Sequence, residues 1–205
     1  MHWLLITLAV ATGGQQDVFV DAFDGKLAGG WRWVHEVEGA WRIDHEGLWI
    51  RALPGTLWGR KNDGKNQLLR DAPAGDASVA VTLRMNPSDP PRWEQAGLLW
   101  YFSDDDFIKL VKELEYGKWN IVMGREQDGR TQVLCVTPIG DGPVRLVLER
   151  TGQKIIGRYS VDGGEWKTAA ESTMPNDGAG EVGLKSQRGP KDTEHWNRFN
   201  DFEIK

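Results

Sequence analysis

The sequence predicts an all-β protein, a two-sheet antiparallel sandwich of the jelly-roll type. Short apolar segments recur at spacings of roughly ten residues, which is typical of sandwiches. Turn-forming glycine, asparagine and aspartate separate these segments, and the chain holds 25 glycines. No segment repeats its apolar residues with the 3.6-residue period that predicts a helix. The pattern therefore disfavours a βαβ fold, in which strands and helices alternate.

The predicted strands follow one another along the chain with a turn signal between neighbours. Residues 40–52 contain two strands across the turn "DHEG". Residues 77–85 alternate apolar and polar side chains, as a half-buried strand does. Residues 119–137 contain two strands, and Asp128-Gly129 between them is a strong hairpin signal. Further strands are expected in residues 143–150, 154–169, 181–186 and 200–205.

The bulk composition is that of a globular protein with a sizeable core. The 205 residues are 40% hydrophobic and 27% charged, and the formal net charge is -5. An acidic chain lacks the positive footprint of proteins that bind nucleic acid or anionic membranes. The longest apolar run, Trp3–Ala11, falls short of the roughly 18 residues of a membrane span. We expect neither nucleic acid nor a membrane span, and composition does not indicate the oligomeric state.

The N-terminus resembles a signal peptide. Its apolar run ends in Ala9-Val10-Ala11, which matches a small-x-small cleavage site. We therefore expect a signal peptide in residues 1–11, a short linker in 12–18, one domain in 19–205, and a secreted or periplasmic location. The run is short and no Lys or Arg precedes it, so a first strand or a misassigned start is the alternative.

The hairpin in residues 94–115 carries the strongest functional signal. If Ser103–Asp106 forms a four-residue loop, Trp100 lies opposite Lys109, and paired residues share a face. That register places an indole beside an amine and two carboxylates, with apolar side chains such as Leu99 and Tyr101 on the core face. The residues expected on the open face are Trp100, Lys109, Glu113 and Glu115, with Glu94 near its edge.

An aromatic, hydrogen-bonding sheet face suits a carbohydrate. The chain contains 11 tryptophans, and an indole offers a flat surface on which a sugar ring can stack. Charged groups beside it would bind the hydroxyls. The alternative is a stabilising Trp–Lys contact on a solvated sheet with no ligand. A slip of one residue in the register would exchange the two faces.

Other residues could contribute to the same binding face. Trp31 and Trp33 share a strand face, where they form either an aromatic platform or packing at the core edge. Lys185 and Gln187 alternate with apolar residues and should point away from the core. His195 lies in a polar loop that could border a groove, and the proline-bearing connection 86–94 could reach over the binding face.

Catalysis and metal binding are weaker hypotheses. Glu113 and Glu115, two apart on a strand, lie roughly 6.5–7 Å from each other. That separation is compatible with an inverting glycosidase, although the pattern is common by chance. The four histidines lack metal-ligand spacing, and the single Cys135 lies in an apolar strand. A structural calcium near the chain ends is conceivable, with the candidate ligands Asp21, Asp24 and Asp201.

Three segments resemble the concanavalin A-like lectin/glucanase superfamily. They are "FDGKLAGGWRW…WRIDHEGLWIRA", "WEQAGLLWYFSDDDFIKLVKE" and "EVGLKS…NDFEIK". The resemblance spans about residues 19–205 and is greatest for the C-terminal jelly-roll domains of β-xylosidases and their stand-alone, uncharacterised relatives. It implies two sheets with a concave face, a carbohydrate-linked context and a possible structural calcium. It does not imply a catalytic centre, because in β-xylosidases this domain is an accessory to a separate catalytic domain. Catalytic relatives carry a Glu-x-Asp-x-Glu strand, and this chain has only Glu113-Leu114-Glu115, which argues against hydrolysis.

Together these observations predict a lectin-like domain that binds a saccharide or glycan on its concave sheet face. One alternative is a glycoside hydrolase that uses Glu113 and Glu115 as acid and base. Another is a structural or protein-binding sandwich without a small ligand.

Overall fold

The computed structural model describes residues 18–85 and 93–205. The predicted signal peptide of residues 1–11 lies outside these ranges, as do nearly all of the predicted linker 12–18 and most of the connection 86–94. Every element in the described ranges is a β-strand, and no helix long and apolar enough to cross a membrane occurs there.

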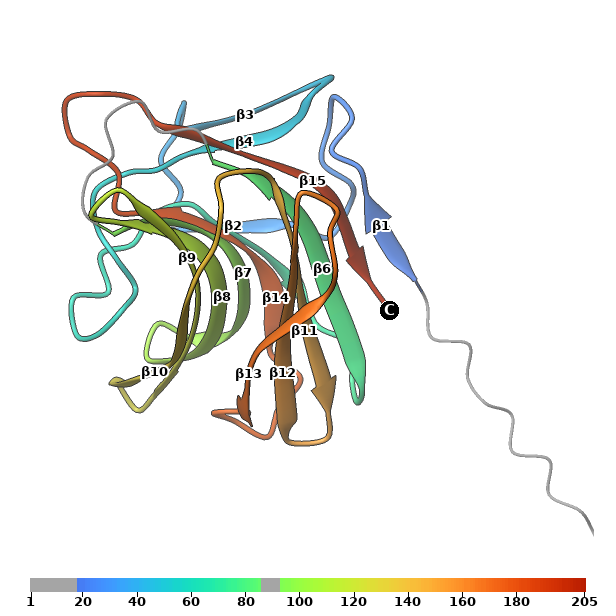
Figure 1. The fold of residues 1–205 in the computed structure, drawn as a ribbon. Coiled ribbons are helices and arrows are strands. Elements are labelled where there is room, and N and C mark those ends of the chain that lie inside the picture. Colours follow the sequence, from blue (N-terminus) through green and yellow to red (C-terminus); the bar gives the residue numbers. More distant parts are fainter. Residues whose placement is uncertain (1–17, 86–92) are drawn as a thin grey trace, which may run out of the picture.

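The strands form two antiparallel sheets that pack face to face (Figure 1). The eight-stranded sheet has the order β13 (Lys167–Thr173), β12 (Lys154–Val161), β11 (Val144–Thr151), β6 (Ala77–Arg84), β15 (Trp196–Ile204), β4 (Gly47–Arg51) and β3 (Trp41–Asp44), with β1 (Phe19–Asp21) on β15. The seven-stranded sheet has the order β10 (Arg130–Pro138), β9 (Lys118–Gln127), β8 (Asp106–Glu115), β7 (Glu94–Ser103), β14 (Glu181–Gln187), β5 (Gln67–Asp71) and β2 (Arg32–Val34). The predicted concanavalin A-like jelly-roll sandwich is confirmed.

The core lies between the two sheets and follows the pleat of the strands. Val79, Val81 and Leu83 alternate along β6 and are fully buried, as the sequence predicted. Leu98 and Leu110, from the seven-stranded sheet, belong to the same buried cluster. Burying one such side chain contributes roughly 1.5–3 kcal/mol, so this alternation fixes which face of each strand points inward.

The predicted register of the β7–β8 hairpin was wrong beyond its tip. Ser103 and Asp106, expected to begin and end a loop, pair with each other, and Tyr101, not Phe102, pairs with Phe107 because the ladder shifts register between Tyr101 and Ser103. Such a bulge slips the register by one residue and exchanges the faces of one strand relative to the other. Leu99, not Trp100, therefore lies opposite Lys109.

Trp100 consequently lies in the core and not on an open face. Its side chain is fully buried between the sheets, and its Nε1 donates to the carbonyl of Ala179 at 2.9 Å. The guanidinium of Arg150 lies 5.7 Å from the indole ring. The predicted stacking role of Trp100 is thus corrected, since a sealed indole cannot contact a ligand.

The loop of residues 52–66, which joins β4 to β5, covers part of the outer face of the seven-stranded sheet. Leu57 from this loop is fully buried in a second apolar cluster on that face. Its sheet partners are Leu69, Leu99, Tyr101 and Phe107. The loop thereby divides the outer face into a covered part and an open part.

Candidate functional site

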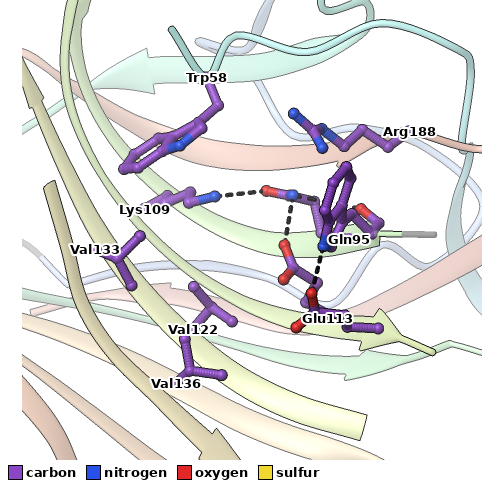
Figure 2. Close-up of a pocket in the computed structure, with 10 residues that line it drawn as sticks. Trp58, Gln95, Lys109, Glu113, Val122, Val133, Val136 and Arg188 are labelled. Atoms are coloured by element: carbon purple, nitrogen blue, oxygen red, sulfur yellow. Dashed lines mark hydrogen bonds between the residues drawn. The ribbon is translucent and has the colours of Figure 1, made fainter. Parts of the chain in front are cut away.

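A pocket of about 360 Å³ lies on the outer face of the seven-stranded sheet, beside the loop 52–66 (Figure 2). This volume falls within the roughly 300–1,000 Å³ of small-molecule sites. Two indoles, a patch of valines and a group of charged side chains line it. These residues are Trp58, Trp93, Gln95, Lys109, Glu113, Glu115, Val122, Val133, Val136 and Arg188.

Trp58 reaches the pocket because the loop 52–66 is tied to the sheet at several points. The amide of Leu57 donates to Gln187 Oε1 on β14 at 3.2 Å, and the amide of Gly59 donates to Glu126 Oε2 on β9 at 3.0 Å. Within the loop, the amide of Thr56 donates to the Asp63 carboxylate at 2.8 Å. These bonds hold both residues that flank Trp58, so its indole is positioned before any ligand arrives.

The indole of Trp58 lies on the sheet because residue 124 has no side chain. A Cβ at Gly124 would come within 2.6 Å of the Trp58 ring, closer than real Cβ contacts allow. Lys109 Nζ lies 4.1 Å from the centroid of the same ring, in a cation–π contact. Gly124 pairs directly with Lys109 across β8 and β9. The space for the Trp58 ring and its contact with Lys109 therefore both follow from the register of these two strands.

Trp93 and Arg188 line the pocket along with Trp58. Trp93 Nε1 donates to Glu115 Oε1 at 2.7 Å, and the Arg188 guanidinium lies 5.2 Å from the centroid of the Trp93 ring. Both residues have a positive φ, 71° for Trp93 and 62° for Arg188. This conformation is uncommon for bulky residues, and such strain clusters at functional sites.

Gln95 connects the acidic and basic groups of the pocket. Its Nε2 donates to Glu113 Oε2 at 2.7 Å, and its Oε1 accepts from Lys109 at 3.0 Å and from Lys185 at 3.2 Å. Figure 2 shows Lys109 to the left of the Gln95 amide, Arg188 above it and Glu113 below it. The amide thus separates a cationic end of the pocket, formed by Lys109 and Arg188, from an acidic end at Glu113 and Glu115.

Burial shifts the titration of these groups towards their neutral forms. It lowers the pKa of Lys109 to about 8, although the nearby charge of Glu113 opposes this shift. Burial, followed by the charge of Lys109, lowers the pKa of Lys185 well below its ordinary value. Burial raises the pKa of Glu113 and of Glu126. The electrostatic interactions in such a desolvated site are stronger than they would be in water.

Three valines form the apolar side of the pocket. Val122 of β9 is buried, whereas Val133 and Val136 of β10 are 56% and 51% exposed. Two exposed β-branched residues beside a polar cluster form an apolar surface next to hydrogen-bonding groups. A ligand with one apolar and one polar face would match this arrangement.

A family of related sequences also matches this chain. The family described as "Protein of unknown function (DUF1349)" matches residues 33–205, which is most of the protein. The chain belongs to this family. No protein with a curated description matches this DUF1349 member significantly.

Solved structures similar to this DUF1349 member include a GH43 protein and a xylan β-1,4-xylosidase. The GH43 protein BlXynB from Bacillus licheniformis shares 22% identity over 90% of this chain and 38% of its own, with a TM-score of 0.79. The xylan β-1,4-xylosidase from Bacillus halodurans C-125 shares 17% identity over 91% of this chain and 38% of its own, with a TM-score of 0.77. The chain spans less than two-fifths of these enzymes, and at such identities the likeness shows the fold.

A stand-alone protein has the same fold. A functionally unknown protein from Saccharomyces cerevisiae shares 11% identity over 86% of this chain and 96% of its own, with a TM-score of 0.68. Together with the xylosidases, it confirms the expected resemblance to β-xylosidase jelly-roll domains and their stand-alone relatives.

Three residues proposed from the hairpin share one face, as predicted. Lys109, Glu113 and Glu115 alternate along β8 and all line the pocket. Lys185 and Gln187 also point away from the core, as expected, but both are buried below the surface of the site. Lys185 contacts Gln95, and Gln187 helps to hold the loop 52–66.

Glu94 and His195 lie elsewhere. Glu94 is fully buried, and His195 Nδ1 lies 2.6 Å from its carboxylate Oε2. Asn197 donates from Nδ2 to Glu94 Oε1 at 3.4 Å and to Ser186 Oγ at 3.0 Å. Burial raises the pKa of Glu94. The predicted position of Glu94 near the open face is therefore corrected: it belongs to a buried polar network with His195, and neither residue lines the pocket.

Trp31 and Trp33 pack at the core edge, the second of the two arrangements considered. Trp31 contacts Phe202 at a centroid distance of 4.7 Å and donates to Asp21 Oδ2 at 2.8 Å. Trp33 lies 4.9 Å from Trp41. They contact different partners, so these two indoles do not form a shared platform.

The aspartates considered for calcium bind the protein itself or face solvent. Asp21 accepts hydrogen bonds from Phe23 N and Ala28 N, both at 2.9 Å, in addition to Trp31. Asp24 and Asp201 are exposed. Within residues 18–85 and 93–205, no group of three or more His, Cys, Asp or Glu side chains could hold a metal. Calcium binding therefore has no preformed ligand set here and stays a prediction.

Seven pocket residues were not singled out from the sequence: three are the valines, and four are Gln95, Arg188, Trp58 and Trp93. Gln95 lies in the motif "WEQAGLLWYF", and its direct pairing with Glu113 follows only from the observed register. Arg188 follows β14, and Trp58 lies in the loop 52–66, between Gly55 and Gly59. Trp93 is the second-last residue of the connection 86–94, for which a position over a binding face was considered from the sequence. That expectation was the only signal pointing to any of the four.

Proposed function

We propose that this protein binds a saccharide in the pocket beside Trp58. The single observation that carries the proposal is the fixed position of that indole, whose neighbours are tied to β9 and β14 and whose ring rests over Gly124. Sugar rings have an apolar face that stacks on such a surface. The fold of xylan-active enzymes is consistent with a carbohydrate-linked role.

The polar groups of the pocket supply the other half of the recognition. Glu113 and Glu115 accept hydrogen bonds from sugar hydroxyls, while Lys109 and Arg188 donate to ring or hydroxyl oxygens. Val133 and Val136 contact the apolar edge of the sugar. Each group acts from a position already held by a protein partner, which lowers the entropic cost of binding.

A glycan array followed by calorimetry tests this proposal. The variant Trp58→Ala should lose binding about tenfold or more, since stacking on an aromatic ring contributes about 1–3 kcal/mol. Trp166→Ala is the control, because Trp166 is a tryptophan that solvent reaches, at 53% exposure, but it lies on the other sheet between β12 and β13. Equal binding by both variants, or no glycan bound by the wild type, would exclude the saccharide site and favour a structural or protein-binding sandwich.

A glycoside hydrolase is the second candidate function, favoured by one observation. Burial raises the pKa of Glu113, which suits a general acid, and Glu115 shares its face two residues along β8. Glu113→Gln would then abolish release of product from a bound oligosaccharide while leaving the oligosaccharide bound. Binding without any product release from the wild type would exclude hydrolysis of the saccharides tested.

A further inference from the structure

Three buried or half-buried cations gather around the pocket without an acidic partner. Lys109 and Lys185 both donate to the same neutral oxygen, Gln95 Oε1. Arg188 stacks on Trp93. Among the described residues, no carboxylate lies within 4.0 Å of these three cationic groups, since none of them takes part in an ion pair. Buried charges are ordinarily paired, so this arrangement is unusual.

The carboxylates nearby are bound by neutral donors instead. Glu113 accepts from the amide of Gln95, Glu115 from the indole of Trp93, and Glu126 from the backbone of Gly59. The three cations are therefore not compensated by direct contact with these acids. Burial also lowers the pKa of both lysines, as expected where a counter-charge in contact is missing.

The charges are separated within the pocket. Lys109 is bound to the oxygen of the Gln95 amide and Glu113 to its nitrogen, and in Figure 2 Arg188 lies above this amide while Glu113 lies below it. Only Lys109 and Arg188 of the three cations line the pocket, while Lys185 lies below them. An incoming group of negative charge would meet two donors at one end and would avoid the acids at the other.

We infer that the saccharide bound here carries a carboxylate, as a hexuronic acid does, and that Lys109 and Arg188 bind this carboxylate. The inference rests on the proposed function and names the class of sugar. The planar guanidinium of Arg188 matches a carboxylate with two parallel hydrogen bonds, and Lys109 supplies a point charge. Trp58 stacks on the sugar ring, and Glu113 accepts from its hydroxyls.

Pairs of ligands in which the carboxylate is either free or methyl-esterified test the inference. Oligosaccharides of galacturonate, glucuronate and mannuronate are titrated into the whole protein by calorimetry, each as the free acid and as its methyl ester. We expect at least one acid to bind about tenfold or more tightly than its ester, because charge-assisted hydrogen bonds contribute about 1.5–3 kcal/mol. Raising the salt concentration should narrow this difference.

Two pocket variants test which residues bind the carboxylate of the sugar. Arg188→Gln and Lys109→Met should each lower affinity for the acid about tenfold more than they lower affinity for the ester. The matched controls are Arg84→Gln and Lys26→Met, which alter exposed residues away from the pocket. A preference that persists in both pocket variants would overturn the assignment of these residues.

The remaining outcomes separate this inference from the proposed function. Equal affinity for acids and esters would overturn the inference and leave saccharide binding standing. Acetate that displaces the oligosaccharide at a similar concentration would reveal a site for simple anions and overturn the uronate assignment. Failure of every saccharide to bind, acidic or neutral, would refute the proposed function and the inference with it.

Discussion

Gln95 and Glu113 lie directly opposite each other on β7 and β8, and the amide nitrogen of Gln95 donates to the Glu113 carboxylate at 2.7 Å. This bond fixes which way the amide points. Its oxygen is therefore turned towards the two lysines, Lys109 and Lys185. The neutral side chain of Gln95 thus connects the carboxylate of Glu113 to the amines of Lys109 and Lys185.

Replacing Gln95 by Leu should destabilise the protein. The change removes the acceptor of two buried ammonium groups and the donor to a buried carboxylate, so we expect a loss of about 3 kcal/mol in the free energy of unfolding. Urea denaturation measures the loss. Gln132→Leu on β10, an exposed position, should change the stability by about 0.5 kcal/mol or less. Equal effects of the two substitutions would show that Gln95 does not connect these groups.

Truncation of Trp100 should mainly reduce stability, whereas truncation of Trp58 should mainly reduce saccharide binding. Trp100→Ala empties a sealed core position and should cost roughly 3–5 kcal/mol of stability. Trp58→Ala removes a half-buried side chain and should cost about 1–2 kcal/mol, while saccharide binding is lost. Thermal unfolding and calorimetry together distinguish the two effects. If folded Trp100→Ala lost binding and Trp58→Ala kept it, the observed β7–β8 register could not underlie the site.

The contrast between these tryptophans shows how far the sequence predicts the molecule. The alternation of apolar residues in β6 and the turn at Asp128-Gly129 correctly predicted strands. These patterns are local, so they do not depend on how the strands pair. Alternation also placed Lys109, Glu113 and Glu115 on one face, because it depends only on their spacing within β8.

Alternation within one strand could not predict which face of the sheet Trp100 occupies. That face depends on the pairing of two strands, and a single bulge near the hairpin tip changes that pairing. Trp58, Trp93 and Arg188 lie outside the strands, where no period fixes the direction of a side chain. The sequence therefore predicted the strands and three of the ten pocket residues, while tertiary contacts of the loop 52–66 determine the position of Trp58.

Gly124→Ala should displace the Trp58 ring without removing it. The added Cβ would come within 2.6 Å of the indole and 3.1 Å of the Lys109 side chain, so the ring must move. We expect saccharide affinity to fall about as far as in Trp58→Ala, roughly tenfold. Gly140→Ala is the control, because a Cβ there meets nothing within 4 Å. Retention of full affinity in Gly124→Ala would argue against a fixed indole as the stacking surface.

Stability should rise with pH above about 8 because of Lys109. Burial lowers its pKa to about 8 in the folded protein, whereas an unfolded lysine titrates near ~10.4. Between these values the unfolded chain binds more protons, so the free energy of unfolding increases as pH rises through this window. The buried Lys185 acts in the same direction. The charged groups that act on Lys109 and Lys185 from the surrounding elements are Glu113, Glu126 and Arg188.

Two variants check this pH dependence. Lys109→Met should flatten the rise in stability measured by urea unfolding between pH 8 and 10, leaving the part due to Lys185. Glu113→Gln removes a negative charge that favours the ammonium form, so the pKa of Lys109 should fall further. Nuclear magnetic resonance of ¹³C-labelled lysine reports that pKa directly. A folded-state pKa near 10 for Lys109 would show that its amine is not desolvated.

The most direct test of the saccharide site is a crystal structure of the protein with the oligosaccharide that binds most tightly in solution. We expect one sugar ring to lie against the Trp58 indole, with its hydroxyls within hydrogen-bonding distance of Glu113. A saccharide bound on another surface, with the pocket beside Trp58 left empty at saturating ligand, would contradict the account.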